Sequence, residues 1–172
     1  MILKPKDDEF AAFYAGYIGK VSTIGPLALL EEQLQTFGRL RELPESTGTH
    51  RYAEGKWTVK EVVGHMADTE RVFSYRLLRI ARADATPLAG FDENAWAASA
   101  PHAGRVLRDV VDEMTAVRRA TLSLVWSLDE AAISRTALAN NKLVSARAIV
   151  WIMPGHAQHH LDILGERYDV KL

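Results

Sequence analysis

The side chains best suited to chemistry lie together near the end of the chain: His156, His159 and His160. Residues four apart on a helix project from the same face, so His156 and His160 would lie one turn apart. Two imidazoles at that spacing can bind one divalent metal ion, as helical histidine pairs do in zinc enzymes. Adjacent helical residues point about 100° apart, so His159 is not expected to share a ligand pair with His160.

A third ligand is available on another predicted helix, residues 59–82. Thr58 and Glu61 stand three positions apart at its start, which is the spacing of a capping box. His65 falls at the edge of the apolar face of this helix, beside Thr69. Three histidine ligands would leave a coordination position open, as in catalytic zinc sites. A histidine that faces a core is, however, more often a hydrogen-bonded packing residue than a ligand.

The histidine pair belongs to a last helix that we expect to begin after Ser145 and to end near Tyr168. On this helix His156 and His160 lie in the middle of the apolar arc and therefore face the interior. Pro154 lies within the helix and predicts a kink about one turn upstream of itself, just before the pair.

The rest of the chain reads as further helices and long connections. A short helix is expected near the N-terminus, and no segment shows the alternation of a convincing strand. Arg118 falls on the polar face of its segment, which predicts an exposed side chain. The pair Asn140-Asn141 predicts a turn. Four long amphipathic segments favour an antiparallel four-helix bundle: residues 26–43, 59–82, 103–126 and 145–168.

Composition bounds the classes of function. The chain has 172 residues, 48% of them hydrophobic and 25% charged, which indicates a single domain over residues 1–172. The net charge of -1 offers no basic surface for nucleic acid or for an anionic membrane. There is no cysteine, so a metal must be held by His, Asp or Glu. The N-terminal residues lack the apolar core of a signal peptide, and a cytoplasmic location is expected.

Several other polar residues are weaker candidates. Glu70 falls on an apolar face, where a structural salt bridge is the more common explanation. Asp68 is expected to be solvated. His50 and His102 fall in predicted loops, and His102 is the better placed of the two for a structural role.

The connection 83–102 is long enough to be functional or to cover a site. Asp92, Asn94 and Trp96 could close over the histidines, although helix packing by Trp96 is an equal alternative. Three arginines of the 59–82 helix could attract an anionic cosubstrate, although such a run is usually an exposed charged face: Arg71, Arg76 and Arg79.

Three stretches together resemble the DinB-like superfamily. Residues 57–68 resemble its tryptophan-to-histidine motif, and residues 155–160 resemble its C-terminal His-x-x-x-His helix. Residues 91–97 are similar to a connecting segment of the YfiT branch, which includes metal-dependent hydrolases and bacillithiol transferases. The three stretches occur in the order found in that family, and the combination is more specific than any one of them.

The resemblance implies an all-α, DinB-like four-helix bundle with up-down-down-up topology and a short extra N-terminal helix. It also implies a homodimer and a divalent metal, zinc or nickel, held by His65, His156 and His160. The best-understood activities of the family join a low-molecular-weight thiol to an electrophile, or isomerise a substrate with the help of a thiol.

These observations lead to the hypothesis of a metal-binding protein with an open three-histidine site that acts as a thiol (S-)transferase on small electrophiles. A thiol cosubstrate would supply the sulfur that this cysteine-free chain lacks. One alternative is a hydrolase that activates water at the same metal. Others are a non-catalytic, stress-related metal-binding bundle and a bundle whose histidines bind no metal. No catalytic residue beyond the ligands is identified by the sequence.

Overall fold

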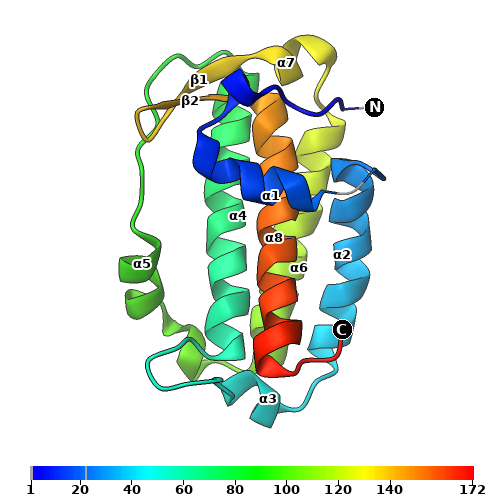
Figure 1. Cartoon of the computed structure of the whole chain (residues 1–172), viewed down its shortest axis with the longest axis vertical. Coiled ribbons are helices and arrows are strands. Elements are labelled where there is room, and N and C mark those ends of the chain that lie inside the picture. Colours follow the sequence, from blue (N-terminus) through cyan, green and yellow to red (C-terminus); the bar gives the residue numbers. More distant parts are fainter. Residues whose placement is uncertain (1, 22) are drawn as a thin grey trace.

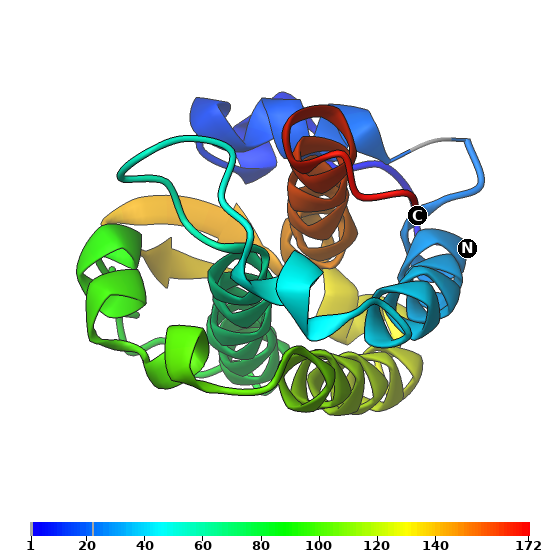
Figure 2. The ribbon, with the colours of Figure 1, turned by 90° about the horizontal axis from the view of Figure 1, so that it is seen from below.

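Four long helices form the body of the computed structural model, which describes residues 2–21 and 23–172. In Figure 1, two of them run in one direction and two in the other, which is the predicted up-down-down-up topology. Figure 2 shows the four helices at the corners of a bundle. The first and second helices along the chain lie at opposite corners, and each packs against both the third and the fourth. The helices are α2 (Pro26–Arg41), α4 (Val59–Ala81), α6 (Leu107–Trp126) and α8 (Ala146–Tyr168).

The starts of these helices follow from local sequence. Thr58 Oγ1 accepts a hydrogen bond from Glu61 N, and Thr58 N donates to Glu61 Oε2 at 2.7 Å, which completes the predicted capping box of α4. Ser145 Oγ accepts from Ala148 N at 2.9 Å at the start of α8. α8 continues through Pro154 as one helix.

Shorter elements fill the connections. The helix expected from residue 103 begins instead at Leu107, because residues 101–104 form a separate 3-10 turn and the chain is extended at Val106. The predicted N-terminal helix is broken into two 3-10 turns and one helical piece. These elements are η1 (Asp7–Glu9), η2 (Ala12–Tyr14), α1 (Ala15–Lys20), α3 (Glu45–Thr49), α5 (Glu93–Ser99), η3 (Pro101–Gly104) and α7 (Glu130–Ser134).

The expectation that the chain has no strand was wrong. β1 (Thr136–Ala139) pairs antiparallel with β2 (Lys142–Ser145) through the predicted Asn140-Asn141 turn. Both turn residues have positive φ, 50° and 58°, as a two-residue hairpin turn requires. The strands are short and partly exposed, so they lack the alternation by which strands are found in sequence. The hairpin is a small addition to a helical fold.

The bundle core has two apolar halves separated by a polar layer. One half surrounds residues such as Leu30 and Ile152, and the other surrounds Phe37 and Leu164. The side chains that lie between the halves in the four helices are Gln33 of α2, Glu70 of α4, Arg118 of α6 and His156 of α8. The predicted metal ligands therefore lie at mid-height in the bundle.

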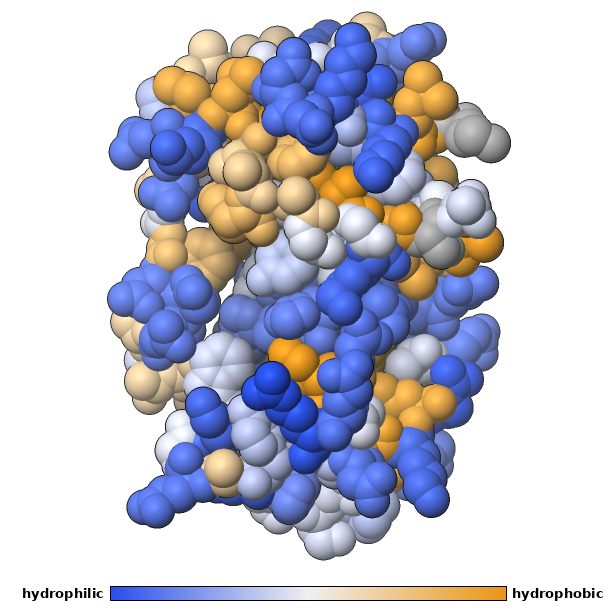
Figure 3. All heavy atoms as spheres, in the orientation of Figure 1, coloured by the Kyte–Doolittle hydropathy of each residue, from blue (hydrophilic) through white to orange (hydrophobic). Residues whose placement is uncertain are grey.

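On the face shown in Figure 3, hydrophobic side chains lie in separate patches among hydrophilic ones. Within residues 2–21 and 23–172, no helix has both the length and the apolar character needed to cross a bilayer.

Candidate metal centre

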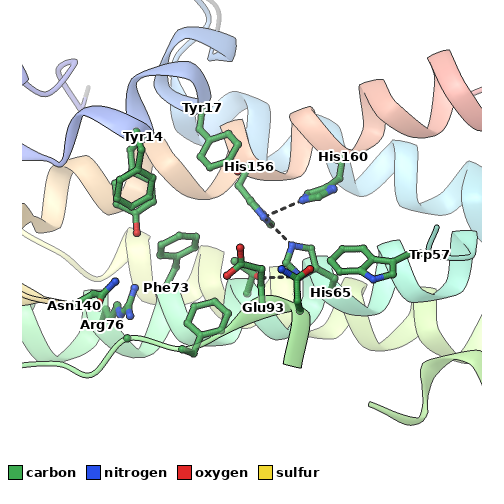
Figure 4. A pocket seen from close by; sticks show the side chains of 15 residues that line it. Tyr14, Tyr17, Trp57, His65, Phe73, Arg76, Glu93, Asn140, His156 and His160 are labelled. Carbon is green, nitrogen blue, oxygen red and sulfur yellow. Dashed lines mark hydrogen bonds between the residues drawn. The ribbon is translucent and has the colours of Figure 1, made fainter. Parts of the chain in front are cut away.

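The structure brings together the three histidines that the sequence singled out. His65 comes from α4, and His156 and His160 come from successive turns of α8. His156 Nε2 lies 3.3 Å from His65 Nε2 and 3.1 Å from His160 Nε2. Figure 4 shows the three rings pointing toward one another between the two helices. In the part of the chain that the structure describes, this is the group of side chains with metal-binding geometry.

The spacings of His156 Nε2 to the other two nitrogens fit a tetrahedral metal ion, and all three ligand atoms lie within 4.8 Å of one another. Nitrogen ligands about 2.0–2.1 Å from zinc are about 3.3 Å apart when the geometry is tetrahedral. Hydrogen bonds alone explain the arrangement less well, because His156 Nε2 faces two other Nε2 atoms. A neutral ring nitrogen carries either one proton or one lone pair, so it can satisfy only one such neighbour fully. A metal ion would use the lone pairs of all three rings.

Burial keeps the three rings in the form that binds metals. Loss of hydration lowers the pKa of His65 to about 4, against a smaller raising effect of the charges of Glu93 and Asp68. Burial and then the neighbouring His65 lower the pKa of His160 to about 3. Burial also holds the pKa of His156 well below its usual value. All three imidazoles are therefore neutral at pH 7, with lone pairs available to a cation.

Surrounding side chains fix the orientation of the rings. Thr69 Oγ1 lies 3.5 Å from His65 Nδ1, one helical turn away, and can accept its proton while Nε2 faces the cluster. Trp57 packs against His65 with ring centroids 4.9 Å apart. Tyr17 meets His156 edge-on at 5.3 Å.

The contact with Tyr17 depends on a glycine beside the metal ligand. A Cβ atom at Gly155 would lie 2.0 Å from the backbone oxygen of Tyr17, so only glycine allows α1 to cross α8 this closely. Figures 1 and 2 show α1 lying across the outer face of α8. The sequence contained the signal, a glycine directly before His156, but its partner could not be inferred from helical periodicity.

A cavity of about 330 Å³ borders the three histidines. This volume is at the lower end of the usual range for small-molecule pockets, roughly 300–1,000 Å³. Six aromatic side chains line it, and polar groups stand at both ends (Figure 4). The aromatic residues of the wall are Phe13, Tyr14, Tyr17, Trp57, Phe73 and Phe91. A metal held by the histidines would thus face a space that admits a small molecule.

The connection between α4 and α6 contributes a carboxylate that sequence analysis did not single out. Glu93 lines the cavity beside His65 (Figure 4) and is the first residue of α5. Asn94 also lines the cavity, whereas Asp92 caps α5 by accepting hydrogen bonds from Asn94 N and Ala95 N. Trp96 is exposed and contacts Phe91 at 4.8 Å, outside the lining of the cavity. The length of this connection was the available signal.

A buried ion pair lies behind the histidines. Arg118, expected to be exposed, is fully buried and binds Glu70 through two hydrogen bonds of 2.8 and 2.7 Å. Its Nη1 also donates to Gln33 Oε1, and Gln33 Nε2 donates to the carbonyl of Pro154 at 2.9 Å. This network joins all four bundle helices and ends two residues before His156. The structural role expected for Glu70 is the one observed.

The remaining histidines have other partners. His159 lies against Tyr17 and is not part of the three-histidine cluster. His102 is buried and bonds to Asp68 at 3.0 Å, so Asp68 is not simply solvated as expected. His50 is exposed and contacts Tyr168.

The three arginines of α4 have different surroundings. Arg71 pairs with Asp68 and Glu113, and Arg79 pairs with Asp84. Arg76 is only 4% exposed and lines the cavity. The expected exposed charged face therefore holds for Arg71 but not for Arg76.

Comparison with known proteins places this geometry in a family. The sequence profile of the DinB superfamily matches residues 28–164. A "putative metal-dependent hydrolase" of Oceanobacillus iheyensis is 26% identical over 137 residues, which cover 76% of this chain and 78% of that protein.

Two solved structures share the fold. YfiT from Bacillus subtilis, described as a probable metal-dependent hydrolase with an unusual four-helix bundle topology, superposes with a TM-score of 0.70 at 18% identity. The match covers 98% of this chain and 95% of YfiT. A mycothiol-dependent maleylpyruvate isomerase superposes with a TM-score of 0.66 at 14% identity, over 87% of this chain and 66% of the isomerase. At these identities the likeness establishes the fold.

Proposed function

The chain belongs to the DinB superfamily, and from that premise we propose that it is a metal-dependent thiol transferase acting on small electrophiles. The observation that carries the proposal is the convergence of three neutral histidines on one point beside a cavity. Three protein ligands leave a coordination position for a reactant, whereas structural zinc sites are closed by four. Among the described residues, the cluster contains three histidines and no carboxylate, which favours catalysis over a purely structural site.

The metal, zinc or nickel, would be held by His65, His156 and His160. When bound, such an ion supplies a Lewis acid that lowers the pKa of a thiol or a water molecule at its open position. Thr69 would keep His65 in the tautomer that binds metal, and Trp57 and Tyr17 would hold the rings in place. The aromatic side chains of the cavity would give the reacting groups a partly apolar surrounding.

A cosubstrate thiol fits a chain that contains no cysteine. In the proposed reaction its sulfur forms a bond to an electrophilic carbon, and the leaving group departs with the bonding electrons. The thiol proton passes to the carboxylate of Glu93, which lines the cavity beside His65. The mycothiol dependence of one structural neighbour is consistent with a thiol in this fold.

Hydrolysis is the second candidate, and the descriptions of two similar proteins favour it. A carboxylate beside a metal site can take a proton from an attacking water as readily as from a thiol. One similar protein is described as a "putative metal-dependent hydrolase" and another as a "probable metal-dependent hydrolase". The ligands are the same for both reactions, so the dependence of turnover on added thiol separates them.

Metal analysis is the first test of the proposal. Purified protein should contain about one zinc or nickel ion per chain, and His160→Ala should abolish binding. His159→Ala is the matched control, because this neighbouring imidazole lies outside the cluster and its loss should leave the metal content unchanged. A protein that takes up no metal, or equal metal loss in both variants, would contradict the proposal.

Turnover is the second test. The metal-loaded protein should conjugate a low-molecular-weight thiol to a halogenated or otherwise electrophilic probe, and His65→Ala should be inactive. Glu93→Gln should retain metal and lose rate, since it keeps the shape of the side chain but not its basicity. Product formed without thiol would establish the hydrolase instead. We also propose that the protein is a cytoplasmic homodimer. Light scattering of the purified protein tests whether it is a dimer.

A further inference from the structure

The end of the cavity away from the metal ligands holds an unusual arginine. Arg76 is 4% exposed, and it lines the same cavity as the three histidines. In Figure 4, Arg76 and Asn140 lie at one end, and His160 and Trp57 lie at the other. An arginine remains charged at any pH at which the protein is folded.

No acidic side chain neutralises this charge within residues 2–21 and 23–172. Arg71 and Arg79 on the same helix each pair with a carboxylate, whereas no described Asp or Glu oxygen lies within 4.0 Å of the Arg76 guanidinium nitrogens. Its Nη2 donates to the carbonyl of Ala89 at 2.7 Å, and its guanidinium lies about 6 Å from the rings of Phe73 and Phe91. These contacts position the group but carry no counter-charge. A buried positive charge without a negative one nearby is unfavourable, and an anionic ligand would relieve this.

The arginine is held in place before any ligand binds. Leu88 N donates to Leu138 O, and Asn140 N donates to Leu88 O, so the hairpin fixes the segment that carries the Ala89 carbonyl. Asn140 packs directly on this segment, because a Cβ at Gly90 would lie 2.4 Å from its Oδ1. Two polar groups from different elements, Arg76 and Asn140, thus face one end of the cavity. Such preorganisation is typical of binding sites.

From this arrangement we infer that Arg76 binds the carboxylate of the substrate, so that the site acts on a small acid with an apolar or aromatic body. The planar guanidinium can bind a carboxylate through two parallel hydrogen bonds. The body of the acid would pack against Phe73 and Phe91, and its reactive end would face the histidines. Glu93 beside His65 disfavours the reverse orientation through repulsion. The catalytic part of this inference rests on the proposed function, whereas carboxylate binding does not.

Binding of three acids of increasing length tests the inference: benzoate, phenylacetate and 3-phenylpropionate. Calorimetric titration of the metal-loaded protein should find at least one acid that binds about tenfold more tightly than its neutral amide. Arg76→Gln should remove this preference. Arg82→Gln is the matched control, because this exposed arginine at the end of the same helix should leave the preference intact.

The same titration on chelator-treated protein separates Arg76 from the metal. The wild type should still prefer the acid over the amide after the metal is removed. The Arg76→Gln variant should lose this preference both with and without metal. Preference that disappears on chelation but survives Arg76→Gln would place the carboxylate on the metal and overturn the inference. Failure of all three acids to bind would also overturn it. The proposed function has a separate test, because it would be contradicted by a protein that binds no metal.

A variant that retains the charge guards against a folding defect. Arg76→Lys keeps the charge but not the two-pronged donor, so the acid should bind more weakly while remaining preferred over the amide. Melting temperatures of all variants are measured in parallel. Unchanged acid binding in a folded Arg76→Gln protein would show that this arginine is a packing residue.

Discussion

The buried pair of Glu70 and Arg118 gives the sharpest test of how the polar layer supports the site. Replacing Glu70 with Ala removes both carboxylate oxygens bound by the guanidinium of Arg118, which is 0% exposed. Gln33 Oε1 and the carbonyl of Leu30 would remain as acceptors, but neither carries a charge. The variant therefore leaves an uncompensated positive charge in the middle of the bundle.

The expected cost is about 3–5 kcal/mol, which is typical of breaking a buried ion pair by removal of one partner. That is a large part of a total stability of about 5–15 kcal/mol. For a chain of this length it corresponds to a fall in melting temperature of roughly 6–20 °C. Urea denaturation and calorimetry of the metal-free protein measure it without interference from ligand binding.

Two comparisons make the result interpretable. Asp112→Ala breaks the exposed pair with Arg41 and should cost about 1 kcal/mol or less. Changing Glu70 to Leu together with Arg118 to Met removes both charges and should cost less than Glu70→Ala alone, because no unpaired charge remains. A Glu70→Ala cost of 1 kcal/mol or less, or a double variant that is worse than the single one, would refute the reasoning.

Three further predictions concern the packing of the site, its metal and the end of α8. Gly155→Ala should destabilise the protein by about 1–3 kcal/mol in urea denaturation, since its Cβ meets the Tyr17 backbone at 2.0 Å. Gly165→Ala, whose nearest neighbour lies at 3.8 Å, should be neutral or slightly stabilising, and equal effects would contradict the crossing of α1. Metal at about 100 times its dissociation constant should add about 2.7 kcal/mol of stability to the wild type and none to His160→Ala, as read from thermal unfolding. Burial raises the pKa of Tyr168 to about 12, from 10.0 when unfolded, and its hydroxyl donates to Trp57 O. Stability from this group is complete below pH 10 and is lost as the pH rises toward 12, so the free energy of unfolding should fall less steeply over that range in Tyr168→Phe.

Local signals were enough to predict the long helices and the direction of the histidine side chains. The Thr58–Glu61 capping box and the Ser145 cap are interactions within one turn, so their partners are specified by sequence spacing alone. Helical periodicity likewise placed His156 and His160 on one inward face and separated them from His159. His65 was found in the same way, at the edge of an apolar arc.

Interactions between distant segments could not be obtained from such spacing. The side chain of Arg118 was predicted to be exposed because it falls on the polar face of its own helix. Its burial is made possible by Glu70 and Gln33, which lie on other helices. Glu93 lies beside the histidines on a connection that the hairpin holds through Leu88, and Arg76 of α4 donates to the Ala89 carbonyl of the same connection. The hairpin itself was missed because its strands are short and half exposed.

Spacing along the chain was thus sufficient to predict the helices and the inward histidines, and the absence of cysteine restricts any metal ligands to His, Asp or Glu. The folded chain was needed to show that the three histidines converge, that Gly155 admits Tyr17, and that a charged arginine faces the same cavity. The physical reason is that helix formation depends on contacts within a few residues. The cavity depends on how helices far apart in the sequence cross, and on which buried charges find a partner there.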